Sequence, residues 1–153
     1  MLNAGRVRRS CDPVGVPAEA RRISGQGSIA FTFRAGSAEQ FGINVRAGNG
    51  QVTQIGYDTT TDEVYVDRTR SGKIIDPTFG AVHRAPLRLH HGTVRLRVLV
   101  DNSSVEVFTD QGQVVLTDQI FPDETSRSVS LFANGGTANL LAGTGWNMRS
   151  IWR

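Results

Sequence analysis

The sequence has very little cysteine and no long apolar run, and each shortage excludes a class of protein. Cys11 is the only cysteine in 153 residues, so an intrachain disulfide and a zinc site built on several cysteines are both impossible. No stretch approaches the roughly 20 apolar residues that a membrane-spanning helix needs. The charged N-terminus has no apolar segment behind it and does not resemble a secretory signal peptide. We therefore expect no membrane partner, and either an intracellular chain or a piece of a longer exported one.

Lysine is also scarce, so the net charge of +3 comes almost entirely from arginine. Lys73 is the only lysine among 17 basic residues. Several arginines crowd the first 22 residues, and the others occur singly along the chain, balanced by acids. No stripe of aromatic and basic residues accompanies them, as a single-stranded nucleic-acid site would require. We expect no nucleic-acid partner.

Helical periodicity is absent, because apolar residues nowhere recur at helical spacing over two full turns. Short alternating runs separated by turn residues take its place. In the plainest run, 93–101, four apolar residues face one way while Arg95 and Arg97 face the other. The expected strands are 27–34, 41–46, 51–58, 63–69, 93–101, 104–109, 114–116, 128–133 and 140–152. This spacing indicates an all-β sandwich or jelly roll.

The composition changes near residue 22 and divides the chain. Residues 1–22 are rich in Gly, Pro and Arg without periodicity, which predicts an N-terminal arm or linker. Residues 23–153 are predicted to form a single sandwich module. Within it, the long segment 72–86 interrupts the strand rhythm, and loops of that length are often functional.

Five phrases of the sequence occur together in a characteristic order. They are IGYD (55–58), YVDRTRSG (65–72), VHRAPL (82–87), LRVLVDNSSVEVFTDQGQVVLTDQIFP (96–122) and SIW (150–152). Together they resemble the C-terminal β-sandwich of family 32 glycoside hydrolases, the levanases, inulinases and invertases. The resemblance extends from about residue 23 to the end. It implies a two-sheet antiparallel sandwich of the jelly-roll, concanavalin A-like lectin type, and kinship with the fructan-binding family 66 carbohydrate-binding modules.

The resemblance also implies where catalysis would take place. In those enzymes a five-bladed propeller precedes the sandwich and carries the catalytic carboxylates in Trp-x-Asn-Asp-Pro, Arg-Asp-Pro and Glu-Cys motifs. Here neither Asp12-Pro13 nor Asp76-Pro77 fits these motifs, and Cys11 follows a serine instead of a glutamate. Phosphate loops, nucleophile elbows and histidines at helical metal spacing are likewise absent. We expect a chain that is not itself an enzyme and holds neither a metal nor another cofactor.

A sugar site would combine carboxylates and arginines, which bind hydroxyl groups, with an aromatic wall. The candidate ligand-binding residues are Asp67, Arg68, Arg70, Glu106, Arg46 and Trp146. The first two form a hydroxyl-binding cluster with Arg70, or else a cross-strand ion pair or a brace for the loop that follows. Glu106 is either a hydrogen-bond acceptor for sugar or part of a solvated outer face. The alternative for Arg46 is that it lies on the solvated surface. The alternative for Trp146 is that it packs in the core.

Two functions remain open from the sequence. The first is a fructan-binding module that holds levan, inulin or a fructose-containing oligosaccharide near the catalytic propeller of a secreted enzyme. Its extracellular location rests on the resemblance alone. The second is a structural or oligomerisation sandwich that braces the propeller and binds no sugar, which predicts an exposed apolar patch.

Overall fold

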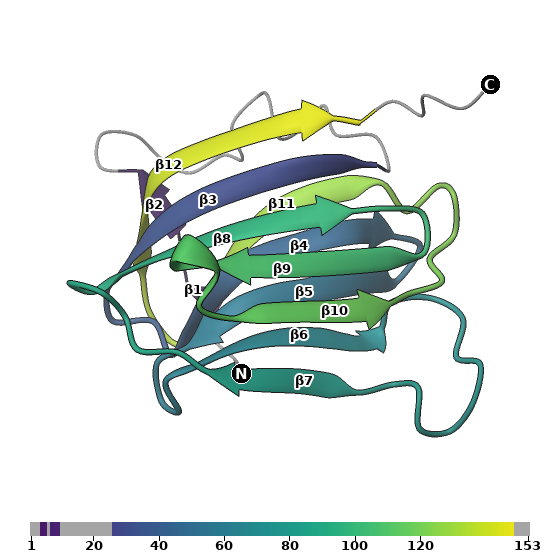
Figure 1. The fold of residues 1–153 in the computed structure, drawn as a ribbon, viewed down its shortest axis with the longest axis horizontal. Coiled ribbons are helices and arrows are strands. Elements are labelled where there is room, and N and C mark those ends of the chain that lie inside the picture. The colour runs from purple at the N-terminus through teal and green to yellow at the C-terminus, as the bar shows by residue number, and fades with distance from the viewer. Residues whose placement is uncertain (1–3, 6, 10–25, 149–153) are drawn as a thin grey trace.

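The computed structural model describes residues 4–5, 7–9 and 26–148, which form two β-sheets packed face to face (Figure 1). The strands are β1 (Ala4–Gly5), β2 (Val7–Arg9), β3 (Gly27–Ala35), β4 (Gln40–Gly48), β5 (Gln51–Asp58), β6 (Glu63–Arg70), β7 (Val82–Pro86), β8 (Thr93–Val100), β9 (Ser104–Thr109), β10 (Val115–Gln119), β11 (Ser128–Asn134) and β12 (Ala138–Asn147). One short 3-10 helix, η1 (Asp110–Gly112), follows β9. The described chain is therefore nearly all β, as the sequence predicts.

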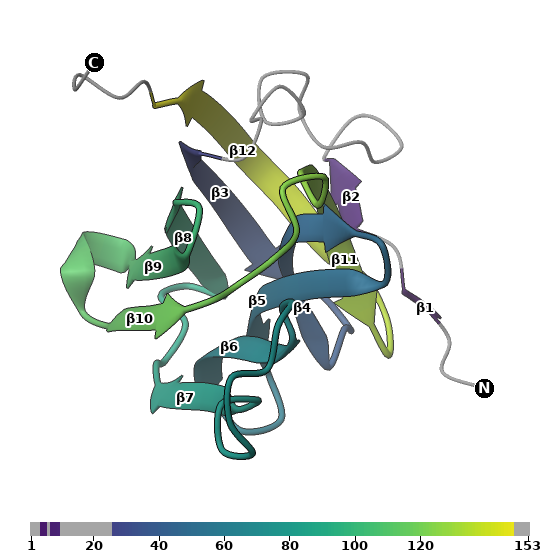
Figure 2. The same ribbon diagram turned by 90° about the vertical axis from the view of Figure 1, so that its right-hand side faces the viewer.

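Each sheet has six strands, of which one is very short. Sheet A has the order β1-β11-β4-β5-β6-β7, and sheet B has the order β10-β9-β8-β3-β12-β2. Neighbouring strands are antiparallel except β12 and β2, which are parallel. Figure 2 shows the two sheets as separate layers of one sandwich. This architecture confirms the predicted fold class.

The core lies between the sheets and follows from the alternating sequence pattern. Ile29, Phe31 and Phe33 on β3 are fully buried, and they face Phe41 and Tyr57 of sheet A. Consecutive rings in this row have centroids 5.4 to 6.1 Å apart. Each fully buried side chain of this size contributes roughly 1.5–3 kcal/mol through removal of apolar surface from water. The predicted inward side of β8 is buried as well, and Arg95 and Arg97 point outward.

The structure changes two of the expected boundaries. Strand β7 falls inside the segment 72–86, which was expected to be one long loop, so the irregular connection ends at residue 81. β7 is an edge strand with mostly exposed side chains, so its sequence lacks the alternation of apolar and polar residues that predicts a strand. Strands β1 and β2 fall inside the expected arm and pair with β11 and β12. Cys11 and the predicted strand end at 149–152 lie outside the described residues.

Candidate functional site

The six sequence-predicted site residues lie on both sheets and do not form a single cluster. Sheet A carries Arg46 on β4 and Asp67, Arg68 and Arg70 on β6, and sheet B carries Glu106 on β9 and Trp146 on β12. The outer faces of the two sheets in a sandwich point in opposite directions. The residues of the two sheets therefore do not share one surface.

Asp67 is engaged in a local turn where β6 leaves the sheet. Its Oδ1 accepts hydrogen bonds from the backbone N–H of Thr69 at 2.9 Å and from the Thr69 hydroxyl at 2.6 Å. A carboxylate in this position satisfies the backbone at the start of a loop. The geometry therefore favours the structural alternative for Asp67.

Arg68 points into the gap between the edges of the two sheets. Its Nη1 donates to the backbone oxygen of Gln119 at 3.0 Å, and its Nε lies 3.5 Å from Oδ1 of Asp118. Its guanidinium also lies 4.2 Å from the ring centroid of Phe79, in the loop after β6. These contacts correspond to the brace that the sequence left open as an alternative to sugar binding.

Asp118 is the centre of this brace. The carboxylate is 2% exposed on β10, and its Oδ1 also lies 2.5 Å from Nδ1 of His83 on β7. Its Oδ2 has no hydrogen-bond partner among the described residues. Arg68, His83 and Asp118 form what we name the edge cluster, which joins sheet A to sheet B across their facing edge strands.

Arg46 and Arg70 have opposite environments. Arg46 is only 5% exposed and donates from Nη2 to the backbone oxygen of Asp123 at 3.4 Å, so its expected solvated alternative is wrong. The segment between β10 and β11 covers it, and this burial, together with Arg127, lowers the pKa of its guanidinium. Arg70 is exposed, and no described side chain pairs with it.

Glu106 and Trp146 do share one face, the outer face of sheet B. Glu106 pairs in register with Leu99, Leu99 with Ser28, and Ser28 with Trp146. Directly paired residues of antiparallel strands point to the same side of the sheet. Trp146 is 55% exposed, so the alternative that placed it in the core is wrong. Glu106 is half-buried and makes no ion pair or hydrogen bond with the described residues.

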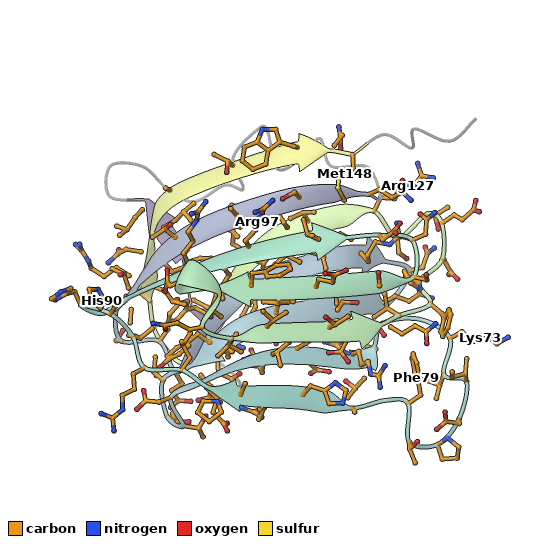
Figure 3. The ribbon with its side chains drawn as sticks, in the orientation of Figure 1. Lys73, Phe79, His90, Arg97, Arg127 and Met148 are labelled. Atoms are coloured by element: carbon orange, nitrogen blue, oxygen red, sulfur yellow. The ribbon has the colours of Figure 1, made fainter. Side chains whose placement is uncertain are left out.

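Arg97 lies between these two side chains. Its Nε is 3.5 Å from the hydroxyl of Ser28, which is the register partner of Trp146. Ser28 is buried although it faces outward, because larger neighbours cover it. On its other side, Arg97 pairs in register with Phe108. Arg97, labelled in Figure 3, therefore has no acidic partner in the described chain and has Phe108 beside it on the neighbouring strand.

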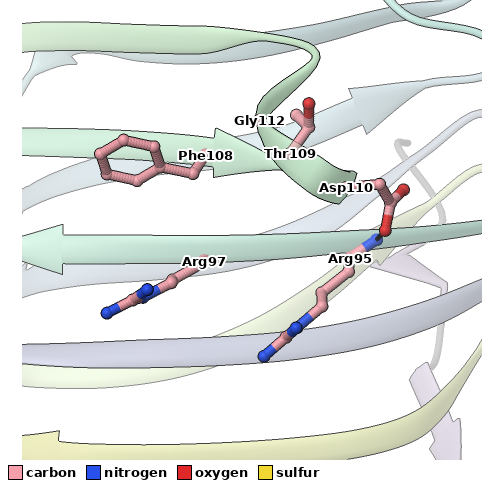
Figure 4. Close-up of a pocket in the computed structure, with 6 residues that line it drawn as sticks. All are labelled: Arg95, Arg97, Phe108, Thr109, Asp110 and Gly112. Carbon is pink, nitrogen blue, oxygen red and sulfur yellow. Dashed lines mark hydrogen bonds between the residues drawn. The ribbon is translucent and has the colours of Figure 1, made fainter.

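A hollow of about 270 Å³ lies beside Arg97 on the same face. It is lined by Arg95, Arg97, Phe108, Thr109, Asp110 and Gly112. Arg95 and Arg97 extend in parallel from β8, and Phe108 lies on the neighbouring strand (Figure 4). The backbone N–H of Arg95 donates a hydrogen bond to Oδ1 of Asp110, with an N–O distance of 3.1 Å, and this bond fixes η1 against β8. The hollow thus has an aromatic wall and two cationic side chains.

The sequence-based candidates do not include Arg95, Arg97 or Phe108. Their signal was present, because a purely structural outer strand does not require two arginines at alternate positions beside an outward-facing, half-buried aromatic residue. Periodicity showed which way these side chains face, but it did not show which strand lies next to β8. Register placed Phe108 and Trp146 on either side of Arg97.

Within residues 26–148 and the two short N-terminal strands, no group of three or more His, Cys, Asp or Glu side chains is placed to hold a metal ion. The same residues include no helix of the length and apolar character that crossing a bilayer requires.

The sequence and the fold of this chain are similar to those of known proteins. The chain matches the family described as "Glycosyl hydrolases family 32 C terminal" over residues 11–147. The levanase of Bacillus subtilis (strain 168) is 38% identical over 144 residues, which are 89% of this chain and 21% of the levanase. The crystal structure of exo-inulinase from Aspergillus awamori has a TM-score of 0.80 at 36% identity, covering 85% of this chain and 26% of that one. Fructan 1-exohydrolase IIa from Cichorium intybus has a TM-score of 0.69 at 16% identity and supports the fold alone.

The two facing sheets define the chain as a β-sandwich domain. It belongs to the family of C-terminal domains of family 32 glycosyl hydrolases. The chain spans 13% of the levanase from Bacillus sp. (strain L7) and 21% of the one from Bacillus subtilis. It therefore corresponds to one domain of such enzymes, and the resemblance expected from the sequence is confirmed.

Proposed function

We propose that this chain is a non-catalytic, fructan-binding domain of a secreted hydrolase that acts on levan or inulin. The observation that carries the proposal is the outer face of sheet B, which presents Glu106, Arg97 and Trp146 on one side and gives neither charged group a described ionic partner. Relatives named levanase and extracellular exo-inulinase supply the sugar class and the secreted setting. The catalytic domain of the same polypeptide would be its partner.

The chemistry of this face suits a neutral, hydroxyl-rich ligand. The carboxylate of Glu106 accepts hydrogen bonds from hydroxyl groups, and the guanidinium of Arg97 donates in a fixed fork. The rings of Trp146 and Phe108 provide apolar surface for the less polar side of a sugar ring. Neither charged group has an ionic partner among the described residues, and the one described hydrogen bond of Arg97, to the hydroxyl of Ser28, is long at 3.5 Å.

Calorimetric titration of the chain with levan, inulin oligosaccharides and fructose tests the proposal. We expect saturable heat with one of the polymers and an affinity in the millimolar to micromolar range, about 4–8 kcal/mol. Arg97→Ala is expected to weaken binding about tenfold or more, since it removes a charged donor from the centre of the face. Arg70→Ala is the matched control, because it removes an equally unpaired arginine from sheet A.

Two results would count against the proposal. A folded chain that gives no heat with any fructan does not bind sugar, and equal losses in Arg97→Ala and Arg70→Ala would move the site away from sheet B. The first result favours the second candidate, a structural brace. The observation behind that candidate is a pair of exposed isoleucines, Ile74 at 47% and Ile75 at 52%, in the loop between β6 and β7.

A further inference from the structure

The outer face of sheet B is organised as two rows of side chains that cross five strands. The first row is Val115, Phe108, Arg97, Ala30 and Thr144, and the second is Thr117, Glu106, Leu99, Ser28 and Trp146. Each row runs from β10 through β9, β8 and β3 to β12, perpendicular to the strands. Both rows contain apolar, charged and hydroxyl side chains.

Both ends of these rows are open along the described part of the chain. At one end, β10 is the edge strand of sheet B, and Val115 is 50% exposed. At the other end, β2 pairs only with 138–140 of β12, well away from Trp146. Strands lie about 4.8 Å apart, so the four steps from β10 to β12 span about 19 Å. A single furanose ring is much shorter than this distance.

We propose that this face binds a run of consecutive fructosyl units from the interior of a fructan chain, lying across the strands from β10 to β12. This inference rests on the proposed function and adds the form of the ligand. Recognition of a chain end requires a wall that stops the polymer on one side. The two rows instead offer exposed or half-buried side chains on β10, β9, β8 and β12, while Ala30 and Ser28 on β3 are buried, and neither end of the rows is closed by a described residue.

The positions of the charged groups support a polymer more than a monosaccharide. Arg97 and Glu106 lie on adjacent strands near the middle of the rows, and each belongs to a different row. Trp146 lies two strands beyond Arg97, at the edge of the face. One sugar unit bound at the arginine does not reach across to all of these groups, whereas a chain of several units contacts the rings at both sides and the charges between them.

Titration with linear inulin or levan oligosaccharides of defined length tests this inference, using whichever linkage the wild-type chain binds. Each linear oligosaccharide has one non-reducing end, so end recognition limits binding to one domain per chain. We expect affinity to rise with length until the oligosaccharide covers the face, and long chains to bind more than one domain. One domain per chain at every length, with fructose bound as tightly as the polymer, would overturn the inference while leaving fructan binding intact.

Variants at the centre and the end of the face give a second readout. Trp146→Ala is expected to lower the affinity for long chains about tenfold and to change trisaccharide binding much less, because it shortens the contact surface at one end. Arg97→Ala is expected to weaken binding at every length. If Trp146→Ala affects all lengths equally, the ligand is confined to one end of the face. If the wild-type chain binds no fructan at all, the proposed function itself fails, and this result is distinguishable from both outcomes for Trp146→Ala.

Discussion

At the scale of single residues, the most consequential side chain outside the outer face of sheet B is the carboxylate of Asp118. It is 2% exposed, and the nearest polar groups to its Oδ1 are Nδ1 of His83 and Nε of Arg68. Removal of one member of a buried ion pair leaves an unpaired charge, which costs more than the pair contributes. The stability of the sandwich edge therefore depends on the complete cluster.

We expect Asp118→Ala to lower the free energy of unfolding by about 3 kcal/mol, because it leaves Arg68 without its counter-charge. Denaturant unfolding measures this, with Asp123→Ala as an exposed control expected to change stability by no more than about 0.5 kcal/mol. The double replacement Arg68→Met with Asp118→Leu should recover most of the loss, since well-packed apolar groups often replace buried ion pairs without cost. A single-variant loss below about 1 kcal/mol would contradict the assigned role.

A second carboxylate makes stability depend on pH. Burial acts to raise the pKa of Asp58, but the hydrogen bonds from Thr60, Gln40 and Arg84 outweigh it, and the pKa is lowered from its ordinary value of 3.8. The folded state therefore binds the proton less readily than the unfolded state. The resulting stabilisation is present above the ordinary pKa and is lost as the pH falls through the lower, folded value.

We expect the advantage of wild type over Asp58→Asn in free energy of unfolding to be greatest near pH 7 and to shrink below about pH 4. Urea unfolding at several pH values measures it. Asp76 is a useful comparison, because hydrogen bonds within its own turn, chiefly from Thr78, also lower its pKa. An advantage of wild type that stays constant from neutral pH to about pH 3 would exclude Asp58 as the source.

At the scale of elements, the loop between β6 and β7 combines a fixed interior with an exposed apolar tip. The ring of Phe79 is 5% exposed and stacks on Phe121 at a centroid distance of 5.5 Å. The backbone N–H of Lys73 donates to the backbone oxygen of Phe121 at 2.9 Å, and Figure 3 shows Phe79 turned inward while Lys73 extends away. Ile74 and Ile75 are exposed on a loop that is nonetheless tied to the sandwich at several points.

We expect the double variant Ile74→Ser with Ile75→Ser to unfold within about 1 kcal/mol of wild type, because both side chains are half-exposed. Phe79→Ser is the matched comparison and should cost about 3 kcal/mol, since it removes a buried ring. Thermal or denaturant unfolding measures both. A large loss in the isoleucine variant would show that these side chains already pack within the isolated domain, and the surface available to a bracing partner would then disappear.

Close packing explains why two positions near the centre of sheet A, 42 and 56, are glycines. A Cβ at Gly42 would lie 2.1 Å from the backbone oxygen of Ile55, and one at Gly56 would lie 2.8 Å from the hydroxyl of Tyr65. Tyr65 lies flat over the sheet and is only 2% exposed although it faces outward. Its hydroxyl donates to Oε1 of Gln54 at 3.2 Å. Both glycines are therefore required by close approach of their neighbours.

At the scale of the whole molecule, alternation in the sequence was sufficient for the fold class and for the inward side of most strands. The pattern of Val94 to Val100 predicts β8 and its buried face, and the structure confirms both. Strand β7 escaped prediction because an edge strand has no buried face to impose alternation. The family resemblance supplied the class of enzyme, which no feature of composition or spacing could have supplied.

The candidate site was predictable only in part, because it depends on strand order. Glu106 and Trp146 are 40 positions apart in the sequence, and only the order β9-β8-β3-β12 brings them onto one face. The contact between Arg68 and Asp118 depends on strand order as well, because no local pattern indicates that β6, next to the edge of sheet A, lies against β10, the edge strand of sheet B. Local patterns indicate the direction of a side chain, whereas its neighbours follow from long-range pairing.

The edge cluster also affects whether copies of this domain aggregate through their sheet edges. An unpaired strand edge invites a strand from another copy, and sheets joined in this way grow into aggregates. The edge strand β10 turns the charge of Asp118 inward, and the edge strand β7 ends in Pro86, which lacks a backbone N–H. Neither β7 nor β10 is therefore a favourable template for pairing with a strand of another molecule. Neighbouring copies lined up on one polymer would accordingly remain separate molecules even at high local density.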